Sequence, residues 1–307
     1  MALRLASAAH HYAHTMWLFT HSDLKTIIVP STIFGLANAT AAHRFHITDV
    51  DSVTWAGVLK RAPLVLLWVW IHLLPLDINN QRDQASIEED RINKPWRPLP
   101  QGRLSVRSAE LNMIAYYVLA QLFSMYIGTG IAQGLILVLL GVWYNNLGGA
   151  NANPFIRNVL NALGYLCFTS GALEVAIGHP ILISLDGTSF SSPRFVCWFA
   201  IIGGIILTTI HGQDMYDQEG DSARGRKTVP LVVGDAAARW MIAGCISAWG
   251  VICPAFWDAV LATRGVCALL AGIVAVRSLA FRDVTSDKAT FFVWNIWVTF
   301  VYVLPLM

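Results

Sequence analysis

Charged residues are scarce in this sequence. Lys, Arg, Asp and Glu make up 13% of the 307 residues, about half of the share found in an ordinary soluble domain. In contrast, 55% of the residues are hydrophobic and the mean hydropathy is +0.54. This composition excludes a soluble globular protein and predicts an all-α integral membrane protein in contact with a lipid bilayer. The net charge of +2 is too small to indicate a nucleic-acid partner.

The sequence also lacks paired cysteines. Its five cysteines lie in apolar stretches, without a CxxC motif and without Cys and His at zinc-ligand spacing. We interpret them as buried small hydrophobic residues, which excludes a disulfide framework and a thiolate metal site. The first 23 residues include histidines but no long apolar run, so a signal peptide is not expected.

Apolar runs occupy most of the chain. About 20 apolar residues cross a bilayer as one helix, and shorter runs can persist inside a bundle. The sequence therefore predicts a single domain, residues 1–307, built as a nine-transmembrane-helix bundle. The expected spans are residues 24–42, 62–78, 109–127, 130–144, 155–178, 195–211, 237–257, 260–279 and 290–306.

The few charges are concentrated in two segments, of which the first is residues 79–107, NNQRDQASIEEDRINKPWRPLPQGRLSVR. Asn79, Asp83 and Asp90 stand at i, i+4 and i+11. A helix continuing out of the preceding span would therefore align all three on one face. Oxygen ligands presented together in this way are typical of a site for a hard cation.

The second charged segment, residues 212–230, follows the sixth expected span. Asp214, Asp217 and Asp221 stand at i, i+3 and i+7, which again indicates one helical face. One such segment alone fits an ordinary solvated loop, but two on one side of the membrane favour a shared site. Clustered carboxylates repel each other unless a cation compensates, and oxygen-only ligands favour Mg²⁺.

Basic residues predict the orientation of the chain. Most of the 21 Lys and Arg residues fall on the side of the two charged segments. The positive-inside rule therefore places residues 79–107 and 212–230 in the cytosol. We expect a multi-pass protein, with the endoplasmic reticulum as its membrane. The opposite side retains only Arg44, Lys60, Arg61, Arg194 and Arg264.

Two carboxylate clusters, an apolar bundle and nearby basic side chains predict a diphosphate substrate with a hydrocarbon tail. Mg²⁺ would neutralise the diphosphate as a leaving group, and aromatic rings would stabilise the resulting carbocation. The available counter-charges for the diphosphate are Lys94, Arg97, Arg224, Arg226 and Lys227. Weaker expectations place Asp77, Asn145 and Glu174 in the chamber or behind the site, with interhelical hydrogen bonding as the alternative for Glu174.

The two charged segments resemble the motifs of the UbiA superfamily of intramembrane prenyltransferases. The first segment combines Asn79, Asp83 and Asp90 with the tail INKPWRPLPQG, and the second reads DMYDQEGD followed by GRKTVP. The resemblance implies a nine-helix bundle, an isoprenyl diphosphate substrate and Mg²⁺ as cofactor. It also implies that catalytic roles belong to Asn79, Asp83, Asp90, Asp214, Asp217 and Asp221, with all of these aspartates as metal ligands.

Two positions depart from the family pattern. The usual spacing would place the last aspartate of the first motif at Ile87, whereas here it is Asp90. Glu89 is therefore interpreted as sharing or replacing a metal-ligand role. Many family members carry a Tyr and Lys pair after the fourth span. Here Tyr144 is present but Arg157 is the only cation in that loop, and both are assigned to the diphosphate.

The longer first motif resembles a fungal subgroup of membrane-bound terpene cyclases. The favoured function is therefore Mg²⁺-dependent cyclisation of farnesyl or geranylgeranyl diphosphate with release of diphosphate. Transfer of the prenyl group to an aromatic or other acceptor is the alternative, because both reactions begin with the same ionisation. A cation-coupled transporter is less favoured, since its carboxylates usually lie at mid-membrane within repeats.

Overall fold

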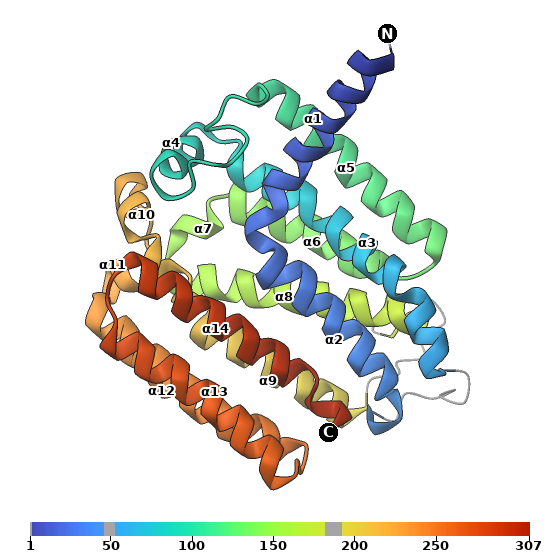
Figure 1. Ribbon diagram of the computed structural model, residues 1–307, viewed down its shortest axis with the longest axis vertical. Helices are drawn as coiled ribbons and strands as arrows, with labels where there is room; N and C mark the ends of the chain where they lie inside the picture. Colours follow the sequence, from blue (N-terminus) through green and yellow to red (C-terminus); the bar gives the residue numbers. More distant parts are fainter. Residues whose placement is uncertain (1, 46–52, 182–191) are drawn as a thin grey trace.

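Helices form the framework of the protein (Figure 1). The computed structural model describes residues 2–45, 53–181 and 192–307, and these ranges contain no strand. The long helices are α1 (Ala2–Thr20), α2 (Val29–Thr40), α3 (Trp55–Gln81), α5 (Val106–Ile127), α6 (Ile131–Asn145), α8 (Pro154–Ile177), α9 (Pro193–Thr209), α12 (Asp235–Phe256), α13 (Leu261–Ala280) and α14 (Val284–Tyr302). The short ones are α4 (Gln84–Asn93), α7 (Gly149–Ala152), α10 (Gln218–Arg224) and α11 (Val229–Val233).

Irregular helical turns join several of these helices. A π-helical segment, Leu24–Ile28, leads into α2, and 3-10 turns occupy His21–Asp23, Ala42–Phe45, Ile210–Gly212, Asp214–Tyr216 and Leu304–Leu306. Two of these 3-10 turns matter most here. His21–Asp23 ends at Asp23 and Asp214–Tyr216 is followed by Asp217, and both aspartates line the cavity described below.

Six described helical stretches are long and apolar enough to cross a membrane. They are Trp55–Gln81, Pro154–Ile177, Pro193–Tyr216, Asp235–Phe256, Leu261–Ala280 and Val284–Leu306. The protein is therefore a multi-pass membrane protein, as predicted. Each of the nine expected spans coincides largely with a helical stretch. However, α2, α5 and α6 do not meet the same length and hydropathy limits, so nine crossings stay a prediction.

Small residues allow close contact between α2 and α8, which cross in the middle of the bundle (Figure 1). At Gly35 on α2, a Cβ atom would lie 2.6 Å from the backbone oxygen of Ala172 on α8. Because backbone atoms of a packed helix cannot rotate away as a side chain can, only glycine permits this approach. Packing of small residues is the usual means of association between helices in lipid.

Gly35→Ala is therefore expected to lower the free energy of unfolding by about 1–3 kcal/mol, the usual cost of overpacking. The measurement is the thermal unfolding midpoint of the purified protein in one detergent. Gly244→Ala on α12 is the matched control, because a Cβ there meets no atom within 4 Å. Equal midpoints for the two variants would contradict the close α2–α8 contact.

The predicted single helical face through Asn79, Asp83 and Asp90 is wrong. Helix α3 ends at Gln81, and Asp83 has an extended backbone, with φ −69° and ψ 144°, as the N-cap of α4. N-cap residues adopt such non-helical dihedral angles, although the Asp83 side chain makes no capping hydrogen bond. The chain therefore turns between Asn79 and Asp90 and starts a new helix.

The second charged segment is also divided. Asp214 begins a 3-10 turn, and Asp217 is the N-cap of α10. The three aspartates therefore do not lie on one regular helix, contrary to the prediction. Helix α10 packs against α4, which brings both charged segments to the same end of the bundle (Figure 1). This arrangement agrees with the inference above that both charged segments lie on the same side of the membrane.

Candidate active site

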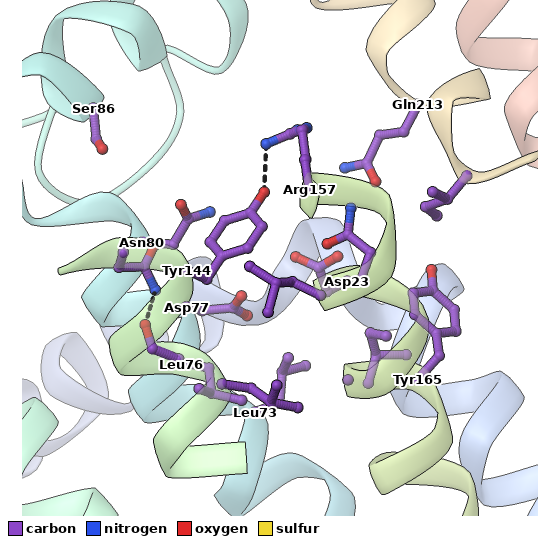
Figure 2. A pocket seen from close by; sticks show the side chains of 18 of the residues that line it. Asp23, Leu73, Leu76, Asp77, Asn80, Ser86, Tyr144, Arg157, Tyr165 and Gln213 are labelled. Atoms are coloured by element: carbon purple, nitrogen blue, oxygen red, sulfur yellow. Dashed lines mark hydrogen bonds between the residues drawn. The ribbon is translucent and has the colours of Figure 1, made fainter. Parts of the chain in front are cut away.

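A cavity of about 200 Å³ lies where the two charged segments meet the bundle. Its walls come from α3, α4, α6, α8 and residues 210–226. In Figure 2 the labelled leucines of α3 lie below Asp77, whereas Tyr144, Arg157 and Gln213 lie above it. The cavity therefore has one apolar and one polar end. Apolar lining residues include Ile27, Leu73, Leu76, Leu137, Leu140, Leu160, Tyr165, Phe168 and Ile210.

The first charged segment contributes Glu89 and Asp90 from α4. Both side chains are buried and line the cavity. The Arg97 guanidinium donates from Nη1 to both oxygens of Asp90, at 2.8 and 3.0 Å. Glu89 accepts hydrogen bonds at Oε2 from Arg224 Nη1 at 2.9 Å and from Arg226 Nε at 2.8 Å. The predicted counter-charges thus surround these two carboxylates.

The second charged segment contributes Asp217 and Asp221, which also line the cavity. Lys94 Nζ donates to Asp217 Oδ2 at 2.7 Å, and Arg226 Nε lies 3.5 Å from Asp221 Oδ1. Asp214 does not line the cavity but accepts at Oδ1 from Arg157 Nη2 at 2.9 Å. Lys94 with Asp217, and Arg224 and Arg226 with Glu89, therefore join the two charged segments.

The predicted pair Tyr144 and Arg157 meets at the polar end of the cavity. Arg157 Nη1 donates a hydrogen bond to the Tyr144 hydroxyl (Figure 2). Helix α6 supplies the tyrosine and α8 supplies the arginine, so the contact links two helices across the site. Asn145, expected in the chamber, also lines the cavity. Tyr144 and Arg157 therefore lie together at the cavity, and their assignment to the diphosphate stays a prediction.

Burial opposes negative charge at this site. It raises the pKa of Asp90 despite the neighbouring Arg97. Burial, followed by the charge of Asp214, raises the pKa of Asp221 to about 7. At Glu89 burial acts in the same direction, but the guanidiniums of Arg226 and Arg224 lower its pKa overall. A bound divalent cation would favour the charged form of each carboxylate.

The carboxylates present fit Mg²⁺. Oδ1 of Asp217 and Oδ2 of Asp221 are buried and have no hydrogen-bond partner within the described ranges. No group of three or more His, Cys, Asp or Glu side chains in that part of the chain forms an all-protein cage. Mg²⁺ does not require one, because it usually binds one or two carboxylates together with water and substrate phosphate.

Two residues predicted for the first motif do not line the cavity. Asn79 is buried and accepts a hydrogen bond from Arg82 Nε at 3.0 Å while donating to Asn146 Oδ1 at 3.0 Å. The Asp83 side chain is 63% exposed and lies 3.6 Å from Arg224. The break between α3 and α4 explains the position of Asp83, because it directs this side chain outward, whereas Asn79 is held within α3 by its hydrogen bonds.

Besides Asp214, three further predicted residues lie outside the cavity lining. Arg224, assigned to the diphosphate and placed at the end of α10, instead donates to Glu89 Oε2. Lys227 is exposed beyond the end of α10. Glu174 is buried near the far end of α8, where its carboxylate accepts hydrogen bonds from Gly130 N, Gln133 Nε2 and Ile181 N at 2.7–3.0 Å. The hydrogen-bonding alternative for Glu174 is therefore the one that its surroundings favour.

Sequence reasoning did not identify several polar residues that line the cavity: Asp23, Asn80, Ser86 and Gln213. Asn80 had a detectable signal, because it lies three residues after Asp77 and shares its helical face. Asp23 had none. It comes from the turn before the π-helical segment, and only the folded chain brings it to the cavity.

Asn93 connects the two charged segments. Its Nδ2 donates to the backbone oxygen of Asp217 at 3.0 Å, and its Oδ1 accepts from Gly220 N at 3.2 Å. A Cβ atom at position 220 would collide with the Asn93 amide. One side chain at the end of α4 therefore fixes the start of α10, including the backbone of Asp217.

Gly220→Ala is expected to displace the Asn93 amide and to lower turnover by about 10- to 100-fold, as loss of a ligand-orienting contact does. Asn93→Ala should have a similar effect. The measurement is diphosphate release from farnesyl or geranylgeranyl diphosphate by each single variant and by the double variant. The double variant should lose no more than either single one, because both changes remove the same contact. Additive losses would contradict the connection.

Comparison with known proteins gives one family match and several similar enzymes. The UbiA prenyltransferase family matches residues 28–296. A fumagillin beta-trans-bergamotene synthase of Aspergillus fumigatus is 30% identical over 306 residues, covering 99% of this chain and 96% of the relative. A somaliensene A/B synthase of Streptomyces somaliensis is 29% identical, covering 93% and 90%. Polyprenyl transferase eriF of Hericium erinaceus is 26% identical, covering 76% and 73%.

A solved structure shares the fold. It is a UbiA homolog from Archaeoglobus fulgidus bound to DMAPP and Mg²⁺, with a TM-score of 0.58 at 15% identity, covering 92% of this chain and 99% of the homolog. These sequence relatives are enzymes, terpene synthases and a prenyl transferase. The family match covers most of the chain, and the protein therefore belongs to the UbiA prenyltransferase family of enzymes.

Proposed function

We propose that the protein is a Mg²⁺-dependent terpene cyclase. It would ionise linear farnesyl or geranylgeranyl diphosphate, cyclise the carbocation and release diphosphate. The observation that carries this proposal is that one cavity combines charged residues at one end with leucines at the other. A prenyl diphosphate is complementary to both ends. The similarity to two terpene synthases over nearly the whole chain supports the same assignment.

The polar end would bind the diphosphate. Lys94, Arg97, Arg157 and Arg226 line it, and charge-assisted hydrogen bonds from such groups to phosphate oxygens are strong. Mg²⁺, held chiefly by Asp217 and Asp221 with Glu89 and Asp90 nearby, would neutralise the leaving group. In the structure these four basic side chains contact carboxylates. A bound diphosphate would replace those carboxylates as their anionic partner.

The apolar end would hold the hydrocarbon chain and exclude water from the carbocation. Tyr165 and Phe168 of α8 line this region beside leucines of α3 and α6. Aromatic ring faces attract a cation by about 0.5–2 kcal/mol. The tryptophans Trp68 and Trp294 are fully buried but do not line the cavity, so Tyr165 and Phe168 are the aromatic residues proposed for this role.

Transfer of the prenyl group to an acceptor is the second candidate. The similarity to polyprenyl transferase eriF favours it. The two reactions differ only after ionisation, when either a double bond of the same chain or a second molecule captures the cation. The polar groups at the cavity are compatible with both, since they act on the diphosphate.

An incubation without an acceptor separates the two candidates. Purified protein would be supplied with farnesyl or geranylgeranyl diphosphate and Mg²⁺, and the extracted products analysed by gas chromatography and mass spectrometry. A cyclic hydrocarbon that disappears when EDTA is added supports the cyclase. Absence of any cyclic product with both substrates would contradict it, and a prenylated product formed only with an added acceptor would support transfer.

We further infer that residues 1–307 act as one domain in the endoplasmic reticulum membrane, with residues 79–107 and 212–230 in the cytosol. The excess of basic residues on this side supports the orientation. Protease protection of sealed microsomes tests it, because a cytosolic Arg91 or Arg107 is open to trypsin. Cleavage within residues 79–107 only after detergent is added would reverse the orientation.

A further inference from the structure

Asp77 is the carboxylate that lies between the two ends of the cavity. Four α3 residues line the cavity, Leu73, Leu76, Asp77 and Asn80, and their spacing of i, i+3, i+4 and i+7 puts them on one helical face. Along this face Leu73 marks the apolar end and Asn80 the polar end. Figure 2 shows the Asp77 carboxyl group directed into the space between them.

The nearest basic residues of the site, Lys94 and Arg97, make their direct contacts with Asp217 and Asp90 and not with Asp77. The Asp77 side chain is buried, with 8% of the residue exposed, and its Oδ2 has no hydrogen-bond partner within the described ranges. By contrast, Asp90, Asp217 and Glu89 each accept a short hydrogen bond from an arginine or lysine. The acids of the charged segments thus contact basic side chains, and the free oxygens of Asp217 and Asp221 are assigned to Mg²⁺, whereas Asp77 has neither role.

A buried polar atom without a partner is costly, about 1–3 kcal/mol or more for a charged group. Burial of Asp77 at the end of a transmembrane helix is therefore not explained by stability. A second carboxylate, Asp23, lines the cavity from the turn before α2, and its Oδ1 accepts a hydrogen bond from Thr26 Oγ1 at 2.7 Å. Figure 2 shows both carboxyl groups facing the cavity.

We infer that Asp77 accepts the proton that ends the cyclisation. This inference rests on the proposed function. In the step, a C–H bond beside the cationic carbon breaks, and its electron pair becomes the new C=C bond. The proton forms an O–H bond with Oδ2 of Asp77, which becomes a carboxylic acid. The proton then leaves to water or to the released diphosphate, both present at the polar end after ionisation. Carbocation and carboxylate therefore yield a neutral olefin and a neutral acid.

The position of Asp77 suits this role better than the positions of the four cavity-lining acids of the charged segments. Its neighbours on α3 toward the apolar end are Leu73 and Leu76, so a hydrocarbon chain lying against them would pass the carboxylate. Glu89, Asp90, Asp217 and Asp221 come from the charged segments at the polar end, where the diphosphate is proposed to bind. Asp77 would therefore act on the chain itself, after the leaving group has separated.

The test compares Asp77→Asn with the wild type in two readouts, diphosphate release and product composition. Asparagine keeps the shape of the side chain but is a poor proton acceptor. Diphosphate release should stay within about tenfold of wild type, whereas the ratio of the wild-type olefin to alcohols and other olefins should fall by about tenfold or more, since a positioned base contributes at least about a hundredfold. Asp77→Glu should retain more of the wild-type olefin.

A second variant guards against a folding defect. Asp77→Ala with added formate supplies a carboxylate in place of the missing side chain, and the wild-type product ratio should partly return with formate but not with chloride. Glu88→Gln, on the exposed face of α4, is the control with unchanged products. An unchanged product ratio in both Asp77→Asn and Asp77→Ala would overturn the inference. So would loss of diphosphate release that formate does not restore. Failure of the wild type to form any cyclic product would instead refute the proposed function.

Discussion

Asp217→Ala is expected to slow diphosphate release from a prenyl diphosphate by at least about a hundredfold. Asp217 lines the cavity, carries a buried oxygen without a hydrogen-bond partner in the described ranges, and is proposed to hold Mg²⁺. Loss of about 3 kcal/mol of transition-state stabilisation, a modest share of what a metal ion supplies, corresponds to this factor. The measurement is the initial rate of diphosphate release by purified protein at saturating Mg²⁺.

Glu88→Ala is the control for this loss of a carboxylate. Glu88 stands next to Glu89 on α4, but it is exposed and accepts a hydrogen bond from Gln84 Nε2 on the same helix. Its removal should leave the rate within about twofold, as for most surface substitutions. If monodisperse Asp217→Ala protein retained full activity at saturating Mg²⁺, Asp217 would not be a metal ligand. Equal losses in the two variants would point to a general charge effect.

Asp287→Ala is expected to destabilise the protein by about 3 kcal/mol, the lower end of the cost of breaking a buried ion pair. The lower end applies because Arg239 would keep a second carboxylate partner, Asp235 Oδ2, at 2.9 Å. Arg239 on α12 is 1% exposed and donates to both oxygens of Asp287 on α14, at 2.7 and 2.8 Å. The same guanidinium donates to the backbone oxygens of Ser278 and Phe281 on the α13 side, at 3.0 and 3.1 Å. One side chain thus joins three helices.

Thermal unfolding in a single detergent measures this effect. The double variant Arg239→Met with Asp287→Leu should recover much of the lost stability, because it removes both buried charges. Asp283→Ala is the matched control on α14, where a lost N-cap hydrogen bond to Ser286 N costs about 1 kcal/mol. An Asp287→Ala protein that unfolds at the wild-type temperature would show that the pair does not hold these helices together.

The positions of the helices could be predicted because lipid imposes a simple requirement. A helix that crosses a bilayer must be long and apolar, so the stretches that became α3, α8, α9, α12, α13 and α14 were recognisable one by one. The exposed histidines His10 and His14, in contrast, belong to a helix, α1, that was not expected. Helix α1 is held in place because Met16 and Phe19 are buried in a hydrophobic cluster with residues from distant parts of the chain. Local hydropathy does not reveal such contacts.

The chemical character of the site was predictable, but the choice among neighbouring residues was not. Glu89, Asp90, Asp217 and Asp221 do line one cavity, as the clustering of acids indicated. Asp83 does not line the cavity, because the chain turns between α3 and α4 and directs the Asp83 side chain outward. The direction of such a break depends on contacts far along the chain, including Arg82 with Glu110 on α5 and α4 with α10.

The hydrogen bonds between the charged segments affect how such sites can change. Helices α4 and α10 have 10 and 7 residues, and helices this short are marginal in water by themselves. Lys94, Arg224 and Asn93 tie each one to the other. Neither half of the site is therefore an independent module. A substitution that alters the fit of one segment changes the constraint on its partner, so these two stretches would be expected to vary together and to be exchangeable between relatives only as a pair.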